Sequence, residues 1–129
     1  MHWLWIAIGG GLGSMLRFWV QGRVQVMLPG SFPAGTLAVN LIGSLLIGFL
    51  GGILGASSSG AQAQGRYFLM IGFLGGFTTF SSFSLENLNL LRTGQGRLAA
   101  VYMVASNALG LALAFGGYAL SRMFARPPA

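Results

Sequence analysis

Apolar residues form four long runs along the chain, and short polar segments separate them. Each run has about the 20 residues that an α-helix needs to cross the hydrocarbon core of a bilayer. The pattern predicts an all-α integral membrane protein in which residues 1–129 form a single four-helix transmembrane domain. We expect the helices over about Trp3–Met27, Pro33–Ala56, Arg66–Leu91 and Arg97–Phe124, with a polar linker at Ser57–Gly65.

The third apolar run contains the stretch least compatible with a continuous helix. Within Gly72–Phe83, a pair of glycines and a pair of threonines predict a break near Gly75–Thr78. In hydrocarbon, broken backbone is tolerated only where it is buried in protein or lines a cavity. The half-helix that ends there exposes carbonyl groups, which suit a small cation, and the half-helix that begins exposes N–H groups, which suit an anion. We therefore expect the function to be located at this break.

Polar side chains follow a helical spacing in the second and fourth runs. Thr36, Asn40 and Ser44 share one face of the second helix, and Tyr102 and Ser106 place hydroxyl groups on one face of the fourth. Asn40 has two interpretations, because an amide in a membrane needs partners. It either hydrogen-bonds a neighbouring helix or supplies an N–H donor to an anion pathway.

Aromatic residues follow the predicted break. Phe80 and Phe83 are three residues apart, beside a face that also carries Thr79 and Glu86. The edge of an aromatic ring is electropositive, so ring edges that face a pathway can coordinate a small anion weakly. Contact with lipid or with the protein core is the alternative for both rings.

Two charged residues occupy unusual positions in the apolar runs. Arg17 lies well inside the first run, where it either extends to the interface or shapes an electropositive vestibule. Glu86 is the only acidic residue, and it lies near the end of the third helix. We expect Glu86 at the interface, where it can influence entry to a pore.

The composition excludes several other classes of protein. Charged residues make up 6% of the chain, compared with about 25% in a typical soluble domain. The net charge of +6 comes from arginines that lie mostly at the ends of apolar runs, so we expect no nucleic-acid partner. The chain has no cysteine, which excludes disulfides and thiolate metal sites. With one histidine, no aspartate and no acid–base pair, we expect no enzymatic activity.

The arginines are almost evenly divided between the two sides of the membrane. Four spans place both termini on one side, together with Arg66, Arg122 and Arg126, while Arg92 and Arg97 lie opposite with Arg23. The positive-inside rule then gives almost no preferred orientation. Copies inserted both ways can associate as an antiparallel dimer, which would imitate the inverted repeats of many transporters. A weakly biased single topology is the alternative.

Over nearly its whole length the chain resembles the Fluc (CrcB-type) fluoride channels. The resemblance rests on ordered motifs, with Ser14 and Ser82 where the family commonly has alanine and threonine, and Leu111 where some members have serine. The motifs are Gly10–Phe18, Gly35–Asn40 with Gly43, Ser44 and Gly48, Gly72–Phe83, and Tyr102 with Ser106 and Gly110.

The resemblance implies passive, selective export of fluoride across the bacterial cytoplasmic (inner) membrane, and hence resistance to fluoride toxicity. It implies an antiparallel, dual-topology homodimer with two fluoride pathways and a structural sodium ion at its centre. The backbone carbonyls of Gly75 and Thr78 would hold this Na⁺, and Glu86 would lie in a vestibule, where one of the two interpretations also places Arg17. The residues implied for the fluoride pathway are Asn40, Thr79, Phe80, Phe83, Tyr102 and Ser106.

Two rival functions compete with the channel. A small dual-topology, proton-coupled exporter needs a carboxylate that changes charge inside the membrane, and Glu86 is the only candidate. A structural subunit without transport would explain the glycine-rich packing but not the cluster of threonine, phenylalanine and serine at the break.

Overall fold

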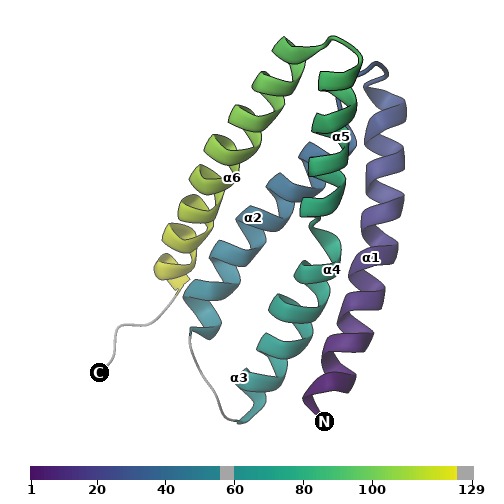
Figure 1. Ribbon diagram of the computed structural model, residues 1–129. Helices are drawn as coiled ribbons and strands as arrows, with labels where there is room; N and C mark the ends of the chain where they lie inside the picture. The colour runs from purple at the N-terminus through teal and green to yellow at the C-terminus, as the bar shows by residue number, and fades with distance from the viewer. Residues whose placement is uncertain (56–59, 125–129) are drawn as a thin grey trace.

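The computed structural model describes residues 1–55 and 60–124, and these residues form helices joined by short connections (Figure 1). The prediction of an all-helical membrane protein is confirmed, because three of the four helical stretches are long and apolar enough to span a bilayer. The first helix, α1, has 26 residues, but Arg17 and Gln21 lower its hydropathy. The elements are α1 His2–Met27, α2 Ala34–Leu54, α3 Gly60–Gly65, η1 Arg66–Leu74, α4 Gly75–Phe77, α5 Phe80–Arg92 and α6 Gly96–Phe124.

The helices form two pairs that are joined along one side. α2 packs against α6, and α1 packs against η1 and α4 while also contacting α2. Figure 1 shows the start of α1 and the end of α6 at one end of the bundle, with the α1–α2 and α5–α6 connections at the other. This arrangement agrees with an even number of membrane crossings.

Glycines allow the backbones of paired helices to touch. A methyl group at Gly13 of α1 would overlap the carbonyl oxygen of Phe73 in η1. In the second pair, a methyl group at Gly48 of α2 would overlap the carbonyl oxygen of Ala114 in α6. Lipid tails are as apolar as leucine, so close contact through small residues is a main source of helix association in membranes.

The predicted break near Gly75–Thr78 is present, and it lies at the C-terminal end of that range. Gly75 is helical, with φ −61° and ψ −37°. The chain leaves the helix at Thr78, with φ −88° and ψ 158°, and remains extended at Thr79. Glycine permits a break without forcing one. The extended backbone occurs where a side chain from α2 supplies replacement hydrogen bonds.

The first half of the broken helix also begins earlier than predicted. Residues 60–65 belong to helix α3, although the sequence pattern predicts a polar linker there. Alanine and glutamine in this segment are good helix formers. The rest of the predicted linker, the predicted end of the second helix at Ala56, and Arg126 lie outside the described residues.

Large apolar side chains cover the outside of the bundle. Phe18 is 82% exposed and Phe115 is 68% exposed, whereas Val39, Ala99 and Tyr102 are fully buried. An exposed apolar surface of this extent suits a bilayer rather than water. Many of the polar side chains instead gather between the helices, around the broken backbone.

Candidate functional site

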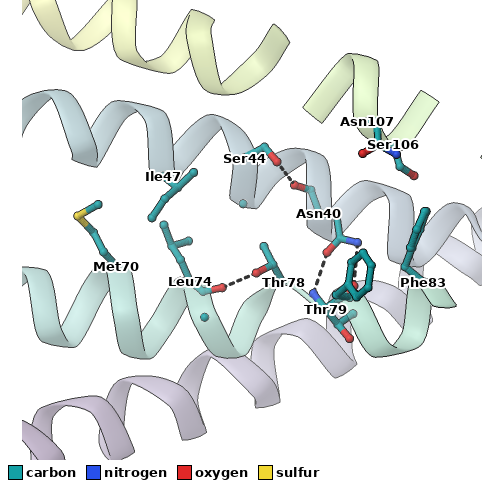
Figure 2. A pocket seen from close by; sticks show the side chains of 13 residues that line it. Asn40, Ser44, Ile47, Met70, Leu74, Thr78, Thr79, Phe83, Ser106 and Asn107 are labelled. Carbon is teal, nitrogen blue, oxygen red and sulfur yellow. Dashed lines mark hydrogen bonds between the residues drawn. The ribbon is translucent and has the colours of Figure 1, made fainter. Parts of the chain in front are cut away.

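The side-chain amide of Asn40 bonds the backbone at the break through two hydrogen bonds to Thr79. Asn40 lies on α2, and its Oδ1 accepts the Thr79 N–H at 2.8 Å. Its Nδ2 donates to the Thr79 carbonyl at 3.1 Å (Figure 2). Unpaired backbone groups are costly away from water, so these two bonds stabilise the extended conformation. One amide N–H is used in this way, and the second N–H remains on a group that lines a pocket.

Thr79 also starts the second half of the broken helix. Its Oγ1 accepts the Ser82 N–H at 3.2 Å, which is the bond that an N-capping threonine makes. Helix α5 then presents the N–H groups of its first turn toward the break. A helix N-terminus carries a partial positive charge and favours an anion.

The two carbonyls predicted to hold sodium have lost the donors that a continuous helix would give them. The Thr79 N–H would bond the Gly75 carbonyl four residues earlier, but it bonds Asn40. The Ser82 N–H would likewise bond the Thr78 carbonyl, but it bonds the Thr79 hydroxyl. The hydroxyl of Thr78 donates to the Leu74 carbonyl at 2.8 Å. Both carbonyl oxygens can therefore accept another donor or coordinate a cation.

A pocket of about 400 Å³ adjoins the break and collects most of the predicted pathway residues. Figure 2 shows the side chains of Asn40, Ser44, Thr79 and Ser106 that line it. The hydroxyl oxygen of Ser106 is buried and has no hydrogen-bond partner among the described residues. Gly43, Ile47, Met70, Leu74, Gly75, Thr78, Phe80, Phe83 and Asn107 complete the lining.

The two phenylalanines lie together at this pocket in different surroundings. The ring centroids of Phe80 and Phe83 are 5.6 Å apart, with an angle of 37° between the planes. Phe80 is 79% exposed, whereas Phe83 is half-buried and its ring centroid lies 5.0 Å from that of Tyr102. Phe83 therefore packs against the protein as well as lining the pocket. The exposed ring of Phe80 is open to the pocket and to the surroundings of the bundle.

Glu86 is held by hydroxyl groups from two other helices. The Thr36 hydroxyl donates to Oε1 at 2.6 Å, and the Tyr102 hydroxyl donates to Oε2 at 2.7 Å. The side-chain amide of Gln21 donates to the Thr36 oxygen at 2.9 Å. Glu86 is only half-buried, but it takes part in a connected network rather than standing alone at the interface.

A second pocket, of about 780 Å³, contains part of this network. Gln21, Thr36 and Glu86 line it together with Arg23, whose guanidinium carbon lies 5.6 Å from the Trp19 ring centroid. This distance is typical of a cation–π contact.

Tyr102 is fully buried and lines neither pocket, but its ring contacts Phe83 of the first pocket and its hydroxyl bonds Glu86 of the second. The predicted hydroxyl stripe of Tyr102 and Ser106 is thus divided, with Ser106 at the first pocket and the Tyr102 hydroxyl directed toward the second.

The structure does not bring Arg17 and Glu86 together at either pocket. Arg17 is half-buried, and its Nε has no hydrogen-bond partner in the part of the chain that the structure describes. Arg17 lines neither of the two pockets. Gln21 was not predicted as a site residue, although a polar residue one turn beyond Arg17 within an apolar run was a usable signal.

Comparison with known proteins places the whole bundle in one family. The family model described as CrcB-like protein, Camphor Resistance (CrcB), matches residues 4–118. A Methylocella silvestris protein named fluoride-specific ion channel FluC is 52% identical over 96 residues, covering 74% of this chain and 73% of the relative.

Two further relatives carry the same name, fluoride-specific ion channel FluC. One, from Erythrobacter litoralis, is 43% identical over 124 residues, covering 93% of this chain and 91% of the relative. The other, from Thermus thermophilus, is 49% identical over 120 residues, covering 92% of this chain and 94% of the relative.

Proposed function

The chain belongs to the CrcB-like family, and from this premise we propose that it is a fluoride-selective channel of the bacterial cytoplasmic membrane. Relatives that match over nine-tenths of the chain are named fluoride-specific ion channels. The observation that carries the proposal is the helix break, where Asn40 makes two hydrogen bonds to the Thr79 backbone. The break adjoins a pocket lined by polar groups and by two phenyl rings. The protein is a non-enzymatic, multi-pass membrane protein, and fluoride moves through it without a chemical step.

The pocket supplies the contacts that a small, strongly hydrated anion needs. A conducting site must replace the water around the ion without holding the ion too tightly. The second N–H of Asn40 and the unpaired hydroxyl of Ser106 are donors at this pocket. The edges of Phe80 and Phe83 add weak electropositive contacts. Weak and strong contacts together allow fluoride to enter and to leave.

The Glu86 network lies along the same route. The hydroxyl protons of Thr36 and Tyr102 are both directed to the carboxylate. A fluoride ion that passes between the two pockets competes with Glu86 for these protons. This competition would occur at Tyr102, because its side chain contacts Phe83 of the first pocket and Glu86 of the second.

We extend the proposal to an antiparallel homodimer with dual topology. The nearly even distribution of arginines supports insertion in both orientations. Gly75 is exposed on this chain, and no atom beyond the adjoining backbone of its own helix lies within 4 Å of the position that a Cβ there would occupy. The backbone beside the break is thus open to a second copy.

The carbonyls at the break fit a sodium ion between the two copies. Hard cations prefer oxygen ligands, and the carbonyls of Gly75 and Thr78 lack their helical donors. The same two carbonyls of each copy would hold the ion. When bound, Na⁺ would neutralise the clustered carbonyl dipoles and stabilise the two broken helices.

The membrane potential sets the direction of transport. An inside-negative potential contributes about 2.3 kcal/mol per charge for each 100 mV, which favours outward movement of an anion. Fluoride that enters the cell as the neutral acid would leave as the ion, and this export would give resistance to fluoride.

The proposal is tested by anion release from liposomes that contain the purified protein. We expect rapid fluoride release under a voltage set by potassium and valinomycin, with no chloride release beyond that of protein-free vesicles. The assay is repeated with equal pH on both sides. Chloride release at the rate of fluoride, or fluoride release only with a proton gradient, would rule out the proposed channel.

A further inference from the structure

The Glu86 network has a direction that the chemistry of its members determines. A carboxylate only accepts hydrogen bonds, so the single proton of the Thr36 hydroxyl must point toward Glu86 Oε1, 2.6 Å away. The Thr36 oxygen can then only accept at its other contact. Gln21 lies 2.9 Å away and presents its N–H₂ group there. The donor side of the Gln21 amide thus keeps the Thr36 proton on Glu86.

The backbone places Gln21 next to Thr36. A methyl group at Gly35, the residue before Thr36, would overlap the carbonyl oxygen of Gln21. Because Gly35 has no side chain, the first turn of α2 rests directly on α1 at Gln21. The side chain of Gln21 then reaches the hydroxyl of the next residue along α2.

Gln25 lies one turn further along the same face of α1 and provides a comparison. Its Oε1 accepts the Gly35 N–H at 3.2 Å, and its Nε2 donates to the Phe32 carbonyl at 3.1 Å. These bonds hold the α1–α2 connection. Gln25 has no hydrogen bond to Thr36 or Glu86 among the described residues, so it is a structural counterpart of Gln21.

We propose that Gln21 is a positioning residue, which orients the Thr36 hydroxyl and thereby maintains the hydrogen bonding of the Glu86 carboxylate. The functional part of this inference rests on the proposed fluoride channel. Without the Gln21 amide, the Thr36 side chain is oriented only by its bond to Glu86, and water can replace the lost donor at its oxygen. The Tyr102 bond is then the one contact of Glu86 whose donor keeps its surroundings. The other charged side chain that lines this pocket is Arg23.

The chain offers a spectroscopic test because Glu86 is its only acidic side chain. Protein labelled with ¹³C at the side-chain carboxyl of glutamate has a single labelled carboxylate group, and hydrogen bonding shifts its antisymmetric stretching band in the infrared spectrum. We expect Gln21→Met and Thr36→Val to shift the band in the same direction. The double variant should shift it no further than Thr36→Val alone. Gln25→Met should leave the band at its wild-type position.

Fluoride release from liposomes is measured on the same variants. Loss of the free energy of one ordered hydrogen bond to a charged group lowers a rate by about tenfold. We therefore expect Gln21→Met to lower the rate of fluoride release by about tenfold. Gln25→Met should lower it less. Gln21→Ala replaces Gln21→Met if the latter does not fold.

A wild-type band in Gln21→Met would overturn the inference, as would a further shift when Gln21→Met is added to Thr36→Val. A fluoride rate in Gln21→Met equal to that in Gln25→Met would also overturn it. If the wild-type protein releases no fluoride, the proposed channel fails, while the infrared comparison still decides the role of Gln21.

Discussion

At the scale of single residues, Asn40 makes the helix break possible. The break inside the membrane leaves the Thr79 N–H without its helical acceptor, and the Asn40 amide accepts this N–H while it also donates to the carbonyl of the same residue. Asparagine provides a donor and an acceptor on adjacent atoms. The two interpretations of Asn40 therefore combine, since its helix-bonding role leaves a second N–H at the pocket.

Asn40→Asp removes the donor to the Thr79 carbonyl and adds a negative charge beside the anion route. We expect a loss of stability of about 0.5–1.5 kcal/mol for the lost hydrogen bond, because the Thr79 carbonyl keeps its bond within α5, and a fluoride rate that falls by more than about tenfold. Thermal unfolding in detergent and liposome release measure the two effects. Ser44→Ala is the control for stability, because the Ser44 hydroxyl donates to the Asn40 carbonyl of its own helix. An Asp variant as stable and as conductive as wild type would disprove this role.

Substitutions at Phe80 and Phe83 should differ in how much they lower the stability of the protein. Phe80→Ile changes a ring that is 79% exposed, so we expect a lower fluoride rate with little change in stability. Phe83→Ile also removes the contact with Tyr102, which adds about 0.5–1.5 kcal/mol of destabilisation. Release assays and unfolding curves on both variants separate the effects. Normal fluoride release in both would remove ring edges from the mechanism.

The residue types at the site could be predicted from the sequence, but their pairings could not. Asn40, Thr79 and Ser106 were singled out, because polar side chains inside apolar runs are rare and costly. The bond from Tyr102 to Glu86 joins α6 to α5, and no spacing within one helix indicates it. The position of Gln21 inside an apolar run marks it as unusual, but its role is not predictable because its partner Thr36 lies on another helix.

At the scale of helices, the contact of α1 with η1 depends on the absence of side chains. Gly13→Ala would push a methyl group into the Phe73 carbonyl. We expect a loss of about 1–3 kcal/mol, as for other insertions into a packed interface. Gly11→Ala is the matched control, because no atom lies within 4 Å of its side-chain position. Thermal unfolding compares the two, and equal stability would show that the contact is not required.

The helices and the approximate position of the break follow from the sequence pattern, but the residue at which the chain leaves the helix does not. The glycine pair suggested broken backbone at Gly75, yet the chain stays helical until Thr78. Local propensity marks where a helix is weak. The position of Asn40 on a neighbouring helix decides which peptide group leaves the helix. The segment at residues 60–65 joined the helix because its alanines and glutamines favour one.

At the scale of the whole molecule, the proposed dual topology predicts two orientations of the same chain. The chain has no cysteine, so Ser31→Cys introduces a single thiol at an exposed position in the α1–α2 connection. With no positive-inside preference, about half of the chains should react with an impermeant maleimide added outside intact cells. Permeabilised cells give the total. Labelling of nearly all chains, or of none, would indicate a single topology.

The central claim is that this chain conducts fluoride passively and in preference to other anions. Its most direct test is the reversal potential of the current through the purified protein in a planar bilayer, with a fluoride gradient, equal chloride and equal pH on both sides. We predict a reversal potential at the value set by the fluoride gradient, unchanged when a chloride gradient is then imposed. A reversal potential that follows chloride or protons would contradict the account.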